Sequence, residues 1–233
     1  MIIQWEMRKK VIQPFCSAAV GDNYGDGEDA MAWADLLIKD LFMRFEVYRH
    51  EYEDPETWRT VMAYFVEKVT PHKLAVYRAG MELAREGWFF QWLGVKPDEW
   101  EMQLMMHDLS KFSANETLAY ATHDFKSTAE DPAFTLAWHH HKMNNPHHPE
   151  YWLSAQRGGE VKPMQMPRRY VAEMVADWMG AGATYGTPLK DWLPENLHQF
   201  VFDAETKYEV MSILDAVFHI KTAIVYTYRI KAL

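Results

Sequence analysis

Apolar residues recur at spacings of three and four along most of this chain, which is the period of helices with one buried face. Few β-branched runs alternate with a period of two, so strand signals are weak. A capping residue precedes proline at Thr70-Pro71 and at Asp131-Pro132, which is typical of helix starts. The sequence therefore predicts an all-α fold with about seven to eight helices.

The expected helices follow from these start signals and from the glycines and prolines between them. Helices are expected over about residues 28–49, 97–112, 167–180 and 204–231, with further starts near residues 55, 71, 113 and 132. The start at 113 rests on a capping-box pattern of Ser113 and Glu116. Residues 155–166 and 180–203 are rich in turn formers and are expected to be irregular.

One domain is the simplest organisation for these 233 residues, because no internal repeat or linker interrupts them. Residues 1–54 are expected to form an N-terminal extension and first helix. Residues 55–181 would form the functional core, and residues 182–233 a C-terminal loop and long helix. Hydrophobic residues make up 48% of the chain, which is enough for a sizeable core.

The net charge of −9 argues against a protein that coats nucleic acid through a broad basic surface. A small phosphorylated substrate stays compatible with this charge, because a bound metal supplies positive charge locally.

No stretch approaches the roughly 20 apolar residues of a membrane span, and no signal-peptide pattern follows the N-terminus. Cys16 is the single cysteine, which fits a reducing compartment. We expect a cytoplasmic protein that binds no membrane; whether it forms a homo-oligomer stays open.

Two candidate sites combine ionisable residues with apolar helical stripes. His72 shares a stripe with apolar neighbours, where a lone histidine is more often a satisfied core residue than a ligand. In the expected helix 97–112, Lys111 follows His107 by four residues and Asp108 by three, so the three side chains would meet beside the core face. An exposed Asp–Lys pair is the simpler interpretation of that patch.

Asp177 lies in the apolar segment VADWM, on or beside a buried helix face. Burying a carboxylate without a partner costs roughly several kcal/mol, so Asp177 needs a partner. A metal shared with His72, His107 and Asp108 would serve. A hydrogen bond from one of the many Trp or Tyr side chains is the alternative.

The segment LAWHHHKMNNPHHPEYW, residues 136–152, holds five of the eleven histidines within ten residues. Such a cluster favours metal or phosphate ligands, although a polar loop of accidental composition is the alternative. At least one of the five histidines is expected to lie at the surface, or to contact a metal-binding residue without binding the metal itself.

These residues resemble the HD superfamily of metal-dependent phosphohydrolases, whose pattern is a histidine, a His-Asp pair and a distant aspartate. HDLSK at 107–111 is similar to the His-Asp-Ile-Gly-Lys run of the HD-GYP branch, and VADWMGA at 175–181 is similar to that branch's Val-Ala-Asp ending. The Gly-Tyr-Pro signature is absent, so nothing supports a cyclic dinucleotide substrate. The segments HDLSKF and NPHH…W also resemble an uncharacterised family common in bacterial viruses, which would place the protein in the host cytoplasm.

The resemblance implies a single HD-like helical domain that hydrolyses a nucleotide or other small phosphate ester through a metal-activated water. It implies one or two divalent transition-metal ions, chosen from Mn, Co, Ni, Fe or Zn. The implied metal ligands are His72, His107, Asp108 and Asp177, with His140 and His148 for a second ion. The implied catalytic residues are Lys111, Asp108 and Asp177, and the implied phosphate-binding residues are Lys111, His141 and His147.

Two other functions stay open at this point. An HD-type oxygenase with two irons would use the same helical cage and the additional histidines. A non-catalytic helical module would instead bind another protein through its aromatic surface, without a tightly bound metal.

Overall fold

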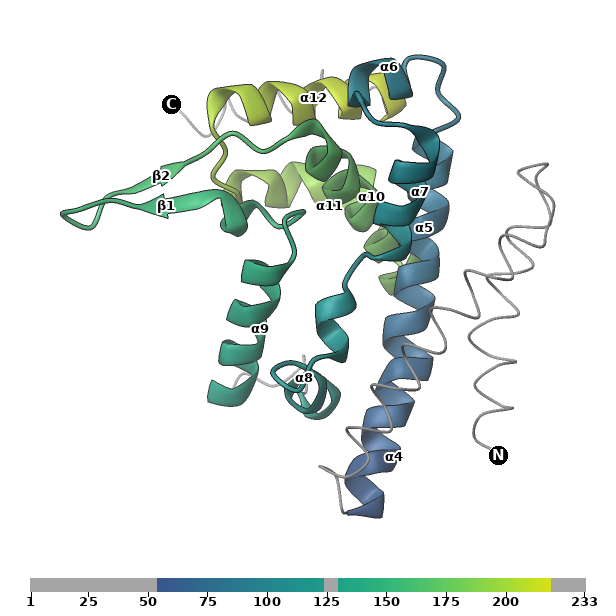
Figure 1. Ribbon diagram of the computed structural model, residues 1–233, viewed down its shortest axis with the longest axis vertical. Coiled ribbons are helices and arrows are strands. Elements are labelled where there is room, and N and C mark those ends of the chain that lie inside the picture. Colours follow the sequence, from purple (N-terminus) through teal and green to yellow (C-terminus); the bar gives the residue numbers. More distant parts are fainter. Residues whose placement is uncertain (1–53, 124–129, 219–233) are drawn as a thin grey trace. The chain divides into compact units, whose positions relative to one another are not determined.

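Helices dominate the computed structural model, which describes residues 54–123 and 130–218 (Figure 1). The α-helices are α4 (Pro55–Tyr64), α5 (Thr70–Leu83), α6 (Phe89–Leu93), α7 (Pro97–Met105), α8 (Thr117–Thr122), α9 (Pro132–Asn144), α10 (Arg168–Tyr185), α11 (Leu189–Asn196) and α12 (Ala204–Phe218). A π-helical segment, η2 (Phe65–Val69), joins α4 to α5, and the 3-10 turns are η3 (Leu109–Phe112), η4 (Pro149–Trp152) and η5 (Leu197–Gln199). The all-α prediction is confirmed.

Strands β1 (Leu153–Ala155) and β2 (Val161–Pro163) form a short antiparallel hairpin that overlaps residues 155–166, which were expected to be irregular. Its loop contains Gly158 and Gly159, whose φ angles of 99° and 88° favour glycine. The second expected loop is also more ordered than predicted, because α10 continues to Tyr185 and α11 follows. The expected helix 28–49 and the end of the last helix lie outside the described residues.

The chain divides into two compact units, which we describe separately. Among the described residues, the first contains 54–74 together with 109–123 and 130–141. The second contains Ala75–Asp108 together with residues 142–218. The expected single domain, with its three parts, stays a prediction.

The first unit has a small core around Phe65, whose ring stacks on Phe112 with the centroids 4.7 Å apart. Asp54 caps α4 by accepting hydrogen bonds from the backbone N–H groups of Glu56 and Thr57.

The predicted cap at Thr70 is wrong, because Thr70 has helical dihedrals and the chain stays helical from α4 through η2 into α5. The π-helical segment η2 accommodates Pro71, which follows Thr70. The π-helical turn shifts the backbone hydrogen-bond pattern close to the position where the N–H of Pro71 is missing.

The second unit is built around α10, which packs against α6, α7, α11 and α12. Its buried residues include Val171, Met174 and Val175, all fully or almost fully enclosed. The carboxylate of Glu209 on α12 anchors the start of α10, since it accepts hydrogen bonds from Arg168 Nε and from Trp92 Nε1, each at 2.7 Å. These contacts hold α10 against α6 and α12.

A close helix crossing fixes the other half of α10. A Cβ atom on Gly180 would lie 2.6 Å from the backbone nitrogen of Val76 on α5, so only glycine fits there. In the same region Trp100 Nε1 on α7 donates to the carbonyl oxygen of Gly80 at 3.1 Å. In the described ranges, no helix has both the length and the apolar character needed to cross a membrane.

We expect Gly180→Ala to lower the free energy of unfolding by about 1–3 kcal/mol, because α5 and α10 must separate to accept the methyl group. Thermal and urea unfolding would measure the loss. Gly87→Ala is the matched control, since a Cβ there meets no atom within 4 Å. Equal stability of the two variants would contradict the tight crossing.

Candidate metal centre

His107 and Asp108 lie in a turn after α7 rather than inside a helix. α7 ends at Met105, and Asp108 has a φ of 57°, the left-handed conformation that ends helices. The predicted helix over 97–112 is therefore too long, and the continuous helical spacing that was expected to bring Lys111 beside His107 does not exist there. Backbone strain of this kind is concentrated at functional sites, and here it lets two consecutive side chains face the same place.

The imidazoles of His107 and His147 share one carboxylate. Glu173 Oε1 accepts from Nδ1 of His107 at 2.9 Å and lies 3.3 Å from Nδ1 of His147. The two rings lie against each other, with centroids 4.3 Å apart and planes 38° apart. All three residues are buried. Because both rings direct Nδ1 toward Glu173, their Nε2 atoms face the opposite side.

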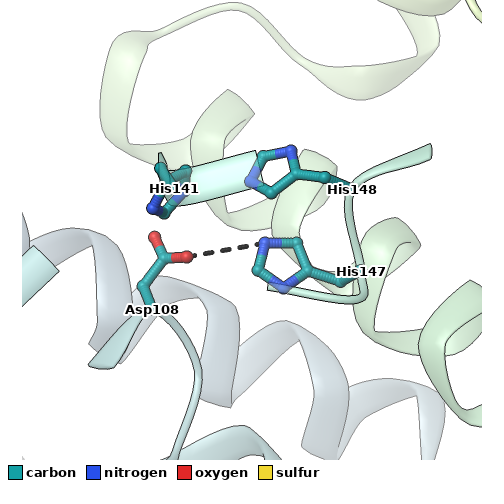
Figure 2. Close-up of side chains that lie close together, drawn as sticks. All are labelled: Asp108, His141, His147 and His148. Atoms are coloured by element: carbon teal, nitrogen blue, oxygen red, sulfur yellow. Dashed lines mark ion pairs between the residues drawn. The ribbon is translucent and has the colours of Figure 1, made fainter. Parts of the chain in front are cut away.

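On that opposite side the Nε2 atoms meet two aspartates. His107 Nε2 lies 3.5 Å from Asp108 Oδ2 and 3.5 Å from Asp177 Oδ1. His147 Nε2 lies 3.5 Å from Asp108 Oδ1 and 3.9 Å from Asp177 Oδ2. Figure 2 shows His147 pointing at Asp108, with this ion pair as a dashed line and the His148 ring beside it.

The separations around each Nε2 atom resemble those between neighbouring ligands of one metal ion. Metal–ligand bonds of about 2.1 Å in a tetrahedron place neighbouring donor atoms roughly 3.4 Å apart. The separations of 3.5 Å around the Nε2 atoms fit that edge. The 2.9 Å contact between Glu173 and His107 is instead an ordinary hydrogen-bond length. A carboxylate that accepts the far N–H of a ligating histidine is a recurrent feature of metal centres.

The negative charges of the three carboxylates in this cluster favour a cation between them. Burial alone would lower the pKa of His107, but the Asp108 charge and hydrogen bonds to two further carboxylates outweigh it and raise the pKa to about 10. Burial would likewise raise the pKa of Glu173, yet hydrogen bonds from the two histidines lower it to about 2. The three carboxylates around the two imidazoles therefore stabilise positive charge, either as protons on the imidazoles or as a bound metal ion.

Helix α10 supplies two of the carboxylates. Glu173 and Asp177 are four residues apart, so they project from the same helix face. Asp177 was predicted as a site residue and Glu173 was not, although the glutamate is also flanked by apolar residues in YVAEMVADWM. That second acidic residue, one turn before the first, was the available signal.

His148 also belongs to this group. One ligand atom from each of Asp108, His147 and His148 lies within 4.8 Å of the others. The rings of His147 and His148 have centroids 4.4 Å apart. His148 was predicted to be a ligand of a second metal ion, and His147 was predicted to bind phosphate. The structure brings both histidines to the same cluster, and the division of roles between them stays a prediction.

The other predicted site residues lie in the first unit. Glu116 does not form the predicted capping box with Ser113, because its buried carboxylate instead accepts from His140 Nδ1 at 2.6 Å and lies 2.9 Å from His141 Nδ1. Ser110 Oγ lies 3.1 Å from that same nitrogen of His141. A nucleophilic serine needs the opposite ring nitrogen, so this is no Ser-His-Glu triad.

His72 is buried on α5, and the ammonium of Lys111 lies 5.7 Å from the centre of the Tyr120 ring. The predicted metal-binding role of His72 and the predicted phosphate-binding role of Lys111 stay predictions. The same holds for His140 and His141, which both contact Glu116.

Residues 62–220 match the model of a family of unknown function (DUF5662), and this match covers well over half of the chain. No curated protein and no solved structure matches the chain. The resemblances to the HD superfamily and to a family of bacterial viruses stay predictions.

Glu173→Ala is expected to destabilise the metal-free protein by about 3–5 kcal/mol, because it removes the buried carboxylate that both imidazoles contact. Urea unfolding in the presence of a chelator measures the change. Glu195→Ala is the control, since Glu195 is an exposed glutamate on α11 of the same unit. A loss no larger than that of the control would contradict the shared-carboxylate arrangement.

Proposed function

This chain belongs to the family of unknown function DUF5662, and we propose from the geometry of its site that it is a metal-dependent hydrolase of small phosphate esters. The proposed metal ligands are His107, Asp108, His147 and Asp177. Glu173 is proposed to orient the two histidines rather than to bind the ion. A nucleotide is the first substrate class to test, and an HD-like arrangement of the helices is part of this proposal.

One observation carries the proposal. Both histidines direct Nδ1 to the same glutamate oxygen and Nε2 to the same pair of aspartates. An N–H donated from Nδ1 leaves the lone pair of a neutral imidazole on Nε2, where a metal binds it. Two imidazoles and two carboxylates are a mixed nitrogen and oxygen set, which suits Mn, Fe, Co, Ni or Zn better than Mg.

A divalent ion held here would lower the pKa of a bound water and offset the charge of a phosphoryl group. The residues themselves set where that chemistry takes place. The side chains of His107, Asp108 and His147 are at most 2% exposed, whereas that of Asp177 is 16% exposed. Solvent therefore reaches this donor set beside Asp177, and we propose that Asp177 orients the attacking water. A partly exposed carboxylate is suited to accept the proton that the water loses.

Elemental analysis of the purified protein should find at least one transition-metal ion per chain. Phosphate release from nucleotides and phosphomonoesters should then be lost when a chelator removes the metal, and added Mn, Co, Ni or Zn should restore it. His107→Ala should lower both metal content and activity, and the loss should exceed the roughly 10–100-fold that follows loss of a residue outside the ligand set. His198→Ala, an exposed histidine of the same unit, is the matched control.

Three results would contradict this function. Two irons per chain with oxygen uptake and no phosphate release would favour the di-iron oxygenase. Absence of bound metal, with a folded His107→Ala variant, would favour a non-catalytic interaction module. Unchanged phosphate release in His107→Ala would place the activity elsewhere in the chain.

A further inference from the structure

We propose that Gln103 on α7 is a positioning residue for the metal site and acts through Glu173. This inference rests on the proposed function, because it assigns a role to the hydrogen bonds behind the same histidines. Gln103 has no place in the HD-like pattern of the sequence.

The amide of Gln103 is held on both sides. Its Nε2 donates to Glu173 Oε2 at 2.5 Å and to the carbonyl oxygen of Arg169 at 3.1 Å. Its Oε1 accepts from Arg169 Nε at 2.7 Å. An amide with a donor partner on one side and acceptor partners on the other has one satisfactory orientation. Arg169 therefore fixes which atom Gln103 presents to Glu173.

The orientation of the Gln103 amide determines which partner each carboxylate oxygen of Glu173 contacts. Gln103 takes Oε2, which leaves Oε1 for the Nδ1 atoms of both His107 and His147. Rotation of the carboxylate by a few tens of degrees would move Oε1 away from one of the rings. The hydrogen bond from Gln103 opposes this rotation, so it keeps both imidazoles turned toward the aspartates.

The polarity of Gln103 matters as much as its shape. A carboxylate at position 103 has nearly the same size but donates no hydrogen bond, and it would repel the charge of Glu173. An amide at position 173 would in turn present an N–H group to the amide of Gln103. Exchanging the two side chains restores one donor and one acceptor between the positions. The regain is incomplete, because the carbonyl oxygen of Arg169 then lacks its donor.

The test is a double-mutant cycle of Gln103→Glu, Glu173→Gln and the two combined, read out as the zinc dissociation constant of the full chain in competition with a coloured chelator. Each single variant should weaken zinc binding by about 10–100-fold, and the combined variant should bind more tightly than either one. Gln91→Glu is the matched control, since Gln91 is an exposed glutamine on α6.

The melting temperature of each metal-free variant separates positioning from folding. A folded Gln103→Glu that binds zinc as tightly as the natural protein would overturn the role of Gln103 and leave the proposed function standing. Additive losses in the combined variant would also overturn it, because they deny a direct link between the two positions. A natural protein that binds no Zn, Mn, Co or Ni would overturn the metal site itself, and this inference with it.

Discussion

The buried carboxylate of Glu173 is the interaction on which the site depends. It contacts the same nitrogen of two imidazoles, and this sets the direction of both rings. Each ring is held at Nδ1 by this contact. With it, each Nε2 faces Asp108 and Asp177, at separations that suit a coordinated ion.

The second unit is organised to keep that carboxylate in place. Helix α10 carries both Glu173 and Asp177, and its start is held by the ion pair between Arg168 and Glu209. Its later part crosses α5 at Gly180, where only a hydrogen atom fits. Rigid support of this kind matters for a metal site, since donor atoms must stay within a few tenths of an ångström of their places.

Several features of the site were predictable because they depend on local chemistry. Asp177 was expected to need a partner, since a carboxylate on an apolar helix face is costly to bury, and the structure surrounds it with histidines. The start of α9 was also predictable, because Asp131 accepts a hydrogen bond from the backbone N–H of Phe134. Glu116 was misassigned for the opposite reason. Its partners lie 24 and 25 residues away, beyond the reach of any local capping pattern.

The sequence by itself determined that the chain is helical, that its apolar stripes form a core, and that histidines and aspartates gather at a few places along it. These properties follow from the period of apolar residues and from side-chain chemistry, which are local. Only the tertiary structure decided that His107, His147 and Glu173 meet, because they come from segments up to 66 residues apart. It also decided that α7 ends before Asp108, whose left-handed backbone turns its carboxylate toward the histidines. A helical pattern in the sequence cannot predict such a turn, since the side chains that contact Asp108 come from elsewhere in the fold.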